Sequence, residues 1–100
     1  MVIPLTVKGK FSLGQLVVTA GVNEKMAEST DFCKFIIASM QKYAGGDWGQ
    51  LDEEDRKTND RALKDGDRIL AAYESPNLPK VWIITEWDRS VTTILFPDEY

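Results

Sequence analysis

The chain has 100 residues, of which 43% are hydrophobic, 10% aromatic and 28% charged. This length supports one hydrophobic core, so we expect a single domain spanning residues 1–100. The hydrophobic fraction excludes an intrinsically disordered chain, and no hydrophobic run approaches the roughly 20 residues that cross a bilayer. Twelve basic and sixteen acidic residues give a net charge of −4, which disfavours nucleic acid as a partner.

The composition also restricts the chemistry. The sequence contains no histidine, which excludes Ser-His-Asp and Cys-His catalytic arrangements and most zinc and iron sites. Its one cysteine, Cys33, cannot form an internal disulfide, and no signal-like segment opens the chain, so we expect a cytoplasmic protein. Phosphate-loop, dinucleotide-binding and paired-cysteine motifs do not occur, so we expect neither a cofactor nor a metal.

The N-terminal segment is expected to be extended. Residues 2–19 are rich in β-branched side chains and are interrupted by proline and glycine, which predicts two short strands. Residues 16–18 should be the more buried part of this segment. A brief helix is expected at about residues 23–28.

Two longer helices are predicted in the middle of the chain. Hydrophobic side chains recur every three or four residues from 32 to 43, after N-cap candidates at 29–31, and Gly45 and Gly46 end this amphipathic helix. Residues 52–65 form a polar surface helix with acidic side chains in its first turn and a lysine in its last. Those acidic side chains lack the spacing of a calcium loop, so helix capping explains them.

The last third predicts three consecutive strands. Residues 68–75, 80–87 and 91–96 are hydrophobic runs of strand length, and turn residues separate them, which is typical of a β-meander. We therefore expect an α+β domain. Its antiparallel sheet should have four to five strands, including this C-terminal three-stranded meander, with two or three helices from the N-terminal and middle regions packed on it.

Residues 45–49, with the sequence Gly-Gly-Asp-Trp-Gly, form a loop between two predicted helices. A tryptophan in such a loop either packs into the core or contacts a partner, because a large ring is costly to leave in water. On the first interpretation, Trp48 fills the bottom of the core and Asp47 caps a turn. On the second, both side chains bind a partner.

The turn between the last two predicted strands carries several charges beside a tryptophan. On a structural interpretation, Asp88 accepts hydrogen bonds from N–H groups of the turn, and Arg89 pairs with Glu86 or Asp88. On a functional interpretation, Arg68 and Arg89 form a clamp for an anion such as a phosphate diester. Glu86 or Asp88 would then act as a carboxylate base, and the hydroxyls of Thr92 and Thr93 would act as donors.

Five sequence blocks between residues 11 and 100 carry a resemblance to a known family. They are FSLGQLVVT from residue 11, GDWG at 46–49, Asp55 with Asn59, GDRILAAY at 66–73, and VWIITEWDRSVTTILFPDEY at 81–100. Together these blocks resemble a group of small bacterial proteins labelled plasmid-related protein, also mislabelled type I restriction endonuclease subunit M. The resemblance implies a protein of mobile elements and names no reaction. Members often carry a histidine where this chain has Tyr43, which implies a ring that packs against Trp48 rather than a catalytic group.

A second likeness concerns the fold. Helices followed by a meander are similar to the C-terminal half of barnase-like and related bacterial ribonuclease toxins. That likeness implies that Arg68 would hold an RNA phosphate. Arg89 would stand where barnase-like enzymes place a histidine, a departure that removes the proton donor.

Two functional hypotheses follow. The first is a non-enzymatic module that binds a protein partner through the loop at 45–49, the acidic helix and the turn at 85–90. Its candidate binding residues are Asp47, Trp48, Arg68, Glu86, Asp88 and Arg89. An acidic surface favours a protein partner over DNA, since residues 45–100 carry thirteen acidic and seven basic side chains. The alternative is a ribonuclease toxin, or its inactive descendant, that acts on RNA through Arg68, Glu86, Arg89 and Thr93.

Overall fold

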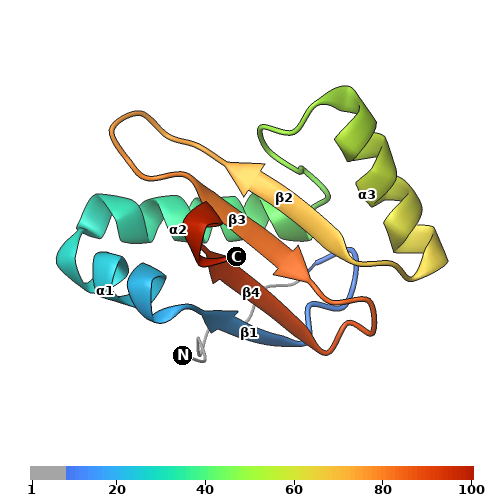
Figure 1. Cartoon of the computed structure of the whole chain (residues 1–100), viewed down its shortest axis with the longest axis horizontal. Helices are drawn as coiled ribbons and strands as arrows, with labels where there is room; N and C mark the ends of the chain where they lie inside the picture. The colour runs from blue at the N-terminus through green and yellow to red at the C-terminus, as the bar shows by residue number, and fades with distance from the viewer. Residues whose placement is uncertain (1–8) are drawn as a thin grey trace.

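The structure, a computed structural model, describes residues 9–100 (Figure 1). In chain order the elements are β1 (Gln15–Val18), α1 (Ala20–Glu28), α2 (Thr30–Ala44), α3 (Glu53–Asp65), β2 (Ile69–Tyr73), β3 (Val81–Thr85), β4 (Val91–Leu95) and the 3-10 helix η1 (Pro97–Glu99). The predicted α+β class and the three C-terminal strands are confirmed. Among the described residues, no helix has the length and hydrophobicity needed to cross a membrane.

The four strands form one mixed sheet in the order β1-β4-β3-β2. The meander pairs β2 with β3 and β3 with β4 in antiparallel fashion, as predicted. The prediction of an antiparallel sheet is wrong for β1, which runs parallel to β4. A long connection that contains all three α-helices separates these two strands, and such a connection returns a strand in either direction. The side-chain alternation within a four-residue strand does not distinguish the two pairings.

The N-terminal predictions are only partly borne out. Of the two strands expected within residues 2–19, the structure contains β1, and the part before residue 9 lies outside the described residues. The brief helix begins at Ala20, three residues earlier than expected. Thr19 explains this start, because its hydroxyl accepts a hydrogen bond from the N–H of Val22 at 3.3 Å and so caps the first turn.

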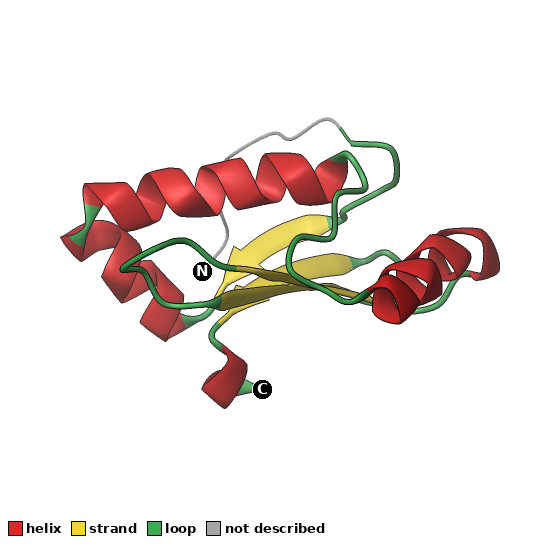
Figure 2. Cartoon of the chain, turned by 90° about the horizontal axis from the view of Figure 1, so that it is seen from above, coloured by secondary structure: helices red, strands yellow, loops and turns green. Residues whose placement is uncertain are grey.

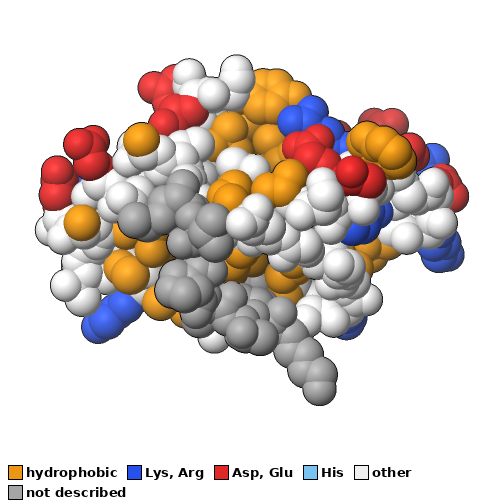
Figure 3. Space-filling view, turned by 90° about the horizontal axis from the view of Figure 1, so that it is seen from below, with side chains coloured by type: hydrophobic (Ala, Val, Ile, Leu, Met, Phe, Trp, Pro, Cys, Tyr) orange, Lys and Arg blue, Asp and Glu red, His pale blue; other side chains and the backbone are white. Residues whose placement is uncertain are grey.

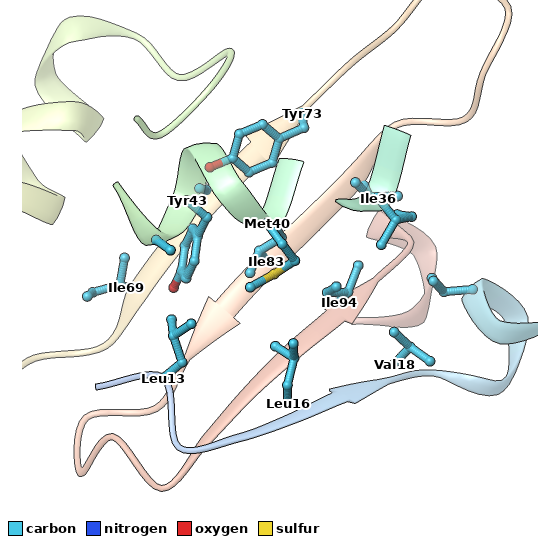
Figure 4. Packing of buried hydrophobic residues seen from close by; sticks show 14 of the residues in the cluster. Leu13, Leu16, Val18, Ile36, Met40, Tyr43, Ile69, Tyr73, Ile83 and Ile94 are labelled. Carbon is cyan, nitrogen blue, oxygen red and sulfur yellow. The ribbon is translucent and has the colours of Figure 1, made fainter. Parts of the chain in front are cut away.

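The amphipathic helix α2 covers one face of the sheet (Figure 2). The Ser29 hydroxyl caps its first turn by accepting a hydrogen bond from Phe32 N–H at 3.1 Å. Ile36 and Met40 point from this helix toward Ile83 and Ile94 of the sheet (Figure 4). The three- and four-residue spacing seen in the sequence therefore describes the side of α2 that the core buries.

Residues paired across neighbouring strands lie on the same face of the sheet. The α2 side contains Leu16, Val18, Ile69, Ala71, Ile83, Thr85, Thr92 and Ile94. The opposite side, here called the open face, contains Val17, Leu70, Ala72, Trp82, Ile84, Thr93 and Leu95. Arg68 and Glu86 extend the open face by one further pair, since their side chains form an ion pair. Of the described elements, only η1 lies on this side (Figure 2).

The polar helix α3 lies beside the edge strand β2 rather than on a face of the sheet (Figures 1 and 2). The carboxylate of Asp52 caps its first turn by accepting a hydrogen bond from Asp55 N–H at 2.8 Å. Gly66 ends the helix in the left-handed conformation, with φ of 78°. The acidic residues at 52–55 therefore belong to the capped first turn, as predicted.

Candidate functional site

Trp48, predicted either to pack or to bind, is part of the core. Its side chain is 3% exposed, and its ring packs edge-on against Tyr43 with the ring centroids 5.5 Å apart. The indole N–H donates a hydrogen bond to the carboxylate of Asp60 on α3 at 3.0 Å. The packing interpretation of Trp48, and the contact with Tyr43 that the family resemblance implied, are thus confirmed.

The rest of the loop at 45–49 pairs with the edge of β2. Gly49 has φ of 73°, and a Cβ atom there would lie 2.1 Å from the carbonyl oxygen of Ala72, so only glycine fits. The carboxylate of Asp47 accepts a hydrogen bond from Gly49 N–H at 3.0 Å, and its carbonyl accepts one from the Tyr73 hydroxyl. Gln50 N–H donates to the Ala72 carbonyl at 2.8 Å. Asp47 therefore holds the turn, as its structural interpretation predicted.

Asn59 of α3 forms hydrogen bonds with the next part of the β2 edge. Its side-chain amide donates to the carbonyl of Leu70 at 2.7 Å and accepts from the N–H of Leu70 at 3.3 Å, as a neighbouring strand would. The side-chain carbonyl of Gln50 accepts from Glu74 N–H at 2.9 Å. An edge strand satisfied in this way does not offer its main chain to another strand. The sequence analysis did not assign this role to Asn59. The available signal was its spacing: Asn59 lies three residues before Ala62, and so on the same side of the helix, which is the buried side.

Arg89 joins the β3–β4 turn to the end of α3. Its guanidinium donates hydrogen bonds to the carbonyls of Asp67 at 2.7 Å, Ala62 at 2.9 Å and Glu86 at 3.2 Å. A cation beside the last turn of a helix also interacts favourably with the helix dipole. Because both Nη atoms donate to main-chain carbonyls, Arg89 acts as an anchor of α3 in this structure. Trp48, Asn59 and Arg89 together are called the α3 anchors below.

Arg68 and Glu86 belong to a different group, on the open face. Arg68 Nε lies 3.6 Å from a carboxylate oxygen of Glu86, and Arg68 Nη1 donates to the hydroxyl of Tyr100. The guanidinium also lies over the Tyr100 ring, 5.1 Å from its centroid. The same ring meets Trp82 edge-on at 5.7 Å. These four side chains, Arg68, Trp82, Glu86 and Tyr100, are called the open-face cluster.

The β3–β4 turn presents a tryptophan next to this cluster. Asp88 accepts hydrogen bonds from the Ser90 hydroxyl at 2.6 Å and the Ser90 N–H at 3.0 Å, and these bonds lower the pKa of Asp88. Asp88 therefore stabilises the turn, as its structural interpretation predicted. Trp87 follows Glu86 directly and is 68% exposed. On the side of the molecule that carries η1, the upper side of Figure 3, hydrophobic side chains reach the surface between charged ones.

The residues predicted as one site thus fall into two groups. Asp47, Trp48 and Arg89 build the junction between α3, β2 and the turn. Arg68 and Glu86 lie on the open face, and Thr93 is on the same face by its pairing with Ile84. The sequence analysis named neither Tyr100 nor Trp82 as a site residue, although Trp82 and Glu86 are an even number of residues apart and therefore lie on one side of an extended strand.

A buried chain of hydroxyl groups lies under the sheet, on the α2 side. The Tyr43 and Thr85 hydroxyl oxygens are 2.6 Å apart, and those of Thr85 and Thr92 are 2.7 Å apart. Thr92 donates to the carbonyl of Leu13 at 2.6 Å. A carbonyl only accepts, so each hydroxyl donates toward Leu13 and Tyr43 is the first donor. Burial raises the pKa of Tyr43, which keeps this donor protonated and makes the chain a structural element.

No metal-binding arrangement is found in residues 9–100, where no three histidine, cysteine or acidic side chains lie close enough to hold an ion. No family model, curated protein or solved structure matches this chain. The fold and the site together define the structural class of this protein. It is an α+β domain whose four-stranded mixed sheet has α2 on one side and the open-face cluster on the other.

Proposed function

We propose that this chain is a non-enzymatic protein-interaction module that binds its partner through the open face and the turn at 86–90. The observation that carries the proposal is the open-face cluster, in which Arg68 is held between an acidic and an aromatic side chain. Tryptophan, tyrosine and arginine dominate the binding energy of protein interfaces. Arg68 is also oriented by its ion pair with Glu86, so it loses less conformational entropy on binding than a free arginine would, which favours affinity.

The proposed surface differs from the one suggested by the sequence. The α3 anchors are engaged within the molecule, so they support the surface instead of contacting the partner. The acidic balance of the C-terminal half favours a protein over a nucleic acid. From the resemblance to plasmid-related proteins, we further propose that the chain acts in the bacterial cytoplasm as an accessory of a mobile element, with a host-defence component as its partner.

The ribonuclease alternative requires two arginines at one phosphate. Arg68 lies on the open face, but the hydrogen bonds of Arg89 go to three main-chain carbonyls. An RNA phosphate would have to replace those bonds, so the geometry favours the interaction module. A direct comparison is growth of a bacterial host after induction of the wild type and of Arg68→Ala. The interaction module predicts normal growth for both, whereas growth arrest relieved by Arg68→Ala would support the toxin.

Affinity capture tests the proposal itself. The wild-type chain is immobilised beside Arg68→Ala, Trp87→Ala and a control, Ile37→Ser, which changes an exposed hydrophobic side chain on α2. We expect the wild type and the control to retain one dominant host protein, and both variants of the proposed surface to lose at least 90% of it. A partner retained equally by all four chains, or no specific partner at all, would contradict the proposal.

A further inference from the structure

The segment after β4 folds back over the open face. Glu99 fixes it, because one carboxylate oxygen accepts hydrogen bonds from the Thr19 hydroxyl at 2.7 Å and from Phe96 N–H at 2.8 Å. With Glu99 held in this way, the ring of Tyr100 reaches Arg68 and Trp82. The segment therefore has two contact points on the domain, one for a carboxylate and one for an aromatic ring.

The place that Tyr100 occupies is defined by the register of the sheet. Arg68 and Trp82 lie in rows on either side of the row that pairs Leu70 with Ile84. Alternate residues of a strand are about 7 Å apart, so the rows of Arg68 and Trp82 are about 14 Å apart, which leaves room for one ring between the two long side chains. Ile84 is buried in the row between them. The domain thus offers a hydrophobic floor with an arginine at one end and an indole at the other.

The Tyr100 ring is held only by weak contacts at the surface of the domain. Tyr100 remains 65% exposed, and η1 contributes no buried residue. Its contacts are one cation–π contact, one edge-on ring contact and one hydroxyl hydrogen bond at the surface. Exposed contacts of this kind change an equilibrium a few-fold each, so the docked ring is favoured over a released ring by about tenfold. A partner with the same chemistry can therefore compete for the place.

Building on the proposed interaction function, we infer that the open face is a docking site for a short acidic partner segment that carries a tyrosine, and that residues 97–100 occupy this site in the free protein. The partner's ring takes the place of Tyr100 between Arg68 and Trp82. A carboxylate before that ring accepts the hydrogen bond of Thr19, as Glu99 does. The chain's own segment, with the sequence Pro-Asp-Glu-Tyr, is the template for this chemistry.

A peptide supplied in trans tests the inference. The probe is the capped peptide Phe-Pro-Asp-Glu-Tyr, added at millimolar concentration, because the segment that it replaces acts at a comparable effective concentration. The protein is the full chain with Tyr100→Ala, and the readout is the NMR shift of the Trp82 indole N–H. We expect saturable binding to Tyr100→Ala, about tenfold weaker binding to the wild type, and intermediate binding to Tyr100→Phe.

Two controls make the result specific. The peptide Phe-Pro-Asp-Glu-Ala should leave the Trp82 signal unchanged. The double variant Trp82→Ala, Tyr100→Ala, which is followed through the Arg68 Nε–H signal instead, should not bind the probe. Equal affinity for the wild type and Tyr100→Ala, or no saturable shift on Tyr100→Ala, would overturn the inference.

The effect on the captured partner separates this inference from the proposed function. If residues 97–100 compete with the partner, Tyr100→Ala raises partner affinity about tenfold, whereas Trp82→Ala lowers it. If both variants lower it, Tyr100 contacts the partner, and the interaction function stands without the competing segment. If neither variant changes partner binding, both the inference and the proposed surface are wrong.

Discussion

Replacing Arg89 with alanine tests the anchoring of α3 by the β3–β4 turn. The substitution removes three hydrogen bonds, between 2.7 and 3.2 Å long, from the carbonyls of Ala62, Asp67 and Glu86. Hydrogen bonds from charged groups are worth about 1.5–3 kcal/mol, and water can reach some of the freed carbonyls, so we expect a loss of about 2 kcal/mol in the free energy of unfolding. For a domain of this size that loss lowers Tm by about 8–16 °C.

The backbone of Arg89 supplies an internal comparison. Its φ of 59° lies in the left-handed region, which costs about 1 kcal/mol for a residue with a Cβ atom. Arg89→Gly loses the same hydrogen bonds but removes that cost, so it should be more stable than Arg89→Ala by up to about 1 kcal/mol. Arg61→Ala is the matched control, because Arg61 is an exposed arginine on α3 whose hydrogen bond to Thr58 is 3.4 Å long.

Urea unfolding followed by circular dichroism measures these differences, and hydrogen exchange of the amides in α3 locates them. The reasoning is refuted if Arg89→Ala stays within about 0.5 kcal/mol of the wild type, the range of ordinary surface substitutions. It is also refuted if the exchange rates in α3 do not rise relative to those in α2.

Four further predictions follow from the same structure. Asn59→Ala should lower the free energy of unfolding by about 2 kcal/mol and promote self-association by uncovering β2, which sedimentation velocity would detect. Gly49→Ala should lower the free energy of unfolding by about 3 kcal/mol, as measured by urea unfolding. Gly45→Ala should be nearly neutral in the same assay, because a Cβ at Gly45 meets nothing closer than 3.5 Å. Tyr43→Phe should cost about 1–2 kcal/mol in the same assay, since it removes the first donor of the buried hydroxyl chain. The pKa of Asp88 is lowered in the folded state, so its contribution to stability is present above the unfolded pKa and is lost as the pH falls through the folded pKa. Asp88→Ala should therefore lose less stability than the wild type as the pH falls below about 5.

Each of these predictions has a contradicting result. A monomeric and fully stable Asn59→Ala would mean that its amide does not protect β2. Equal stability of the two glycine variants would remove the argument from the close approach to Ala72. A neutral Tyr43→Phe would show that the hydroxyl chain contributes nothing. An unchanged pH dependence in Asp88→Ala would show that another group is responsible.

Local patterns in the sequence predicted the elements that local physics determines. The spacing of hydrophobic side chains in α2, the N-cap at Asp52 and the turn residues between the last strands all act within a few residues, and these elements formed where expected. The direction of β1 was not predictable in this way. It depends on where a long connection returns the chain to the sheet, and four alternating residues fit either direction.

The candidate site was predictable only in part, for a related reason. The anchoring of α3 by Arg89 depends on main-chain carbonyls, which every residue has, so the sequence carries no mark of the partner. Trp48 fitted both packing and binding until its neighbours were known. Arg68 and Glu86 were singled out by charge and do lie together, but their contact with Trp82 and Tyr100 depends on how the segment after β4 folds back.

The most direct test of the central claim is a hydrogen-exchange footprint of the full chain with and without its captured partner. The claim is that the open face contacts the partner, while the α3 anchors only support it. We predict slower exchange on binding in residues 82–87 and 91–95, with no change at 47–50 or in α3. Protection confined to the loop at 47–50 and to α3, with β3 and β4 unchanged, would contradict the account.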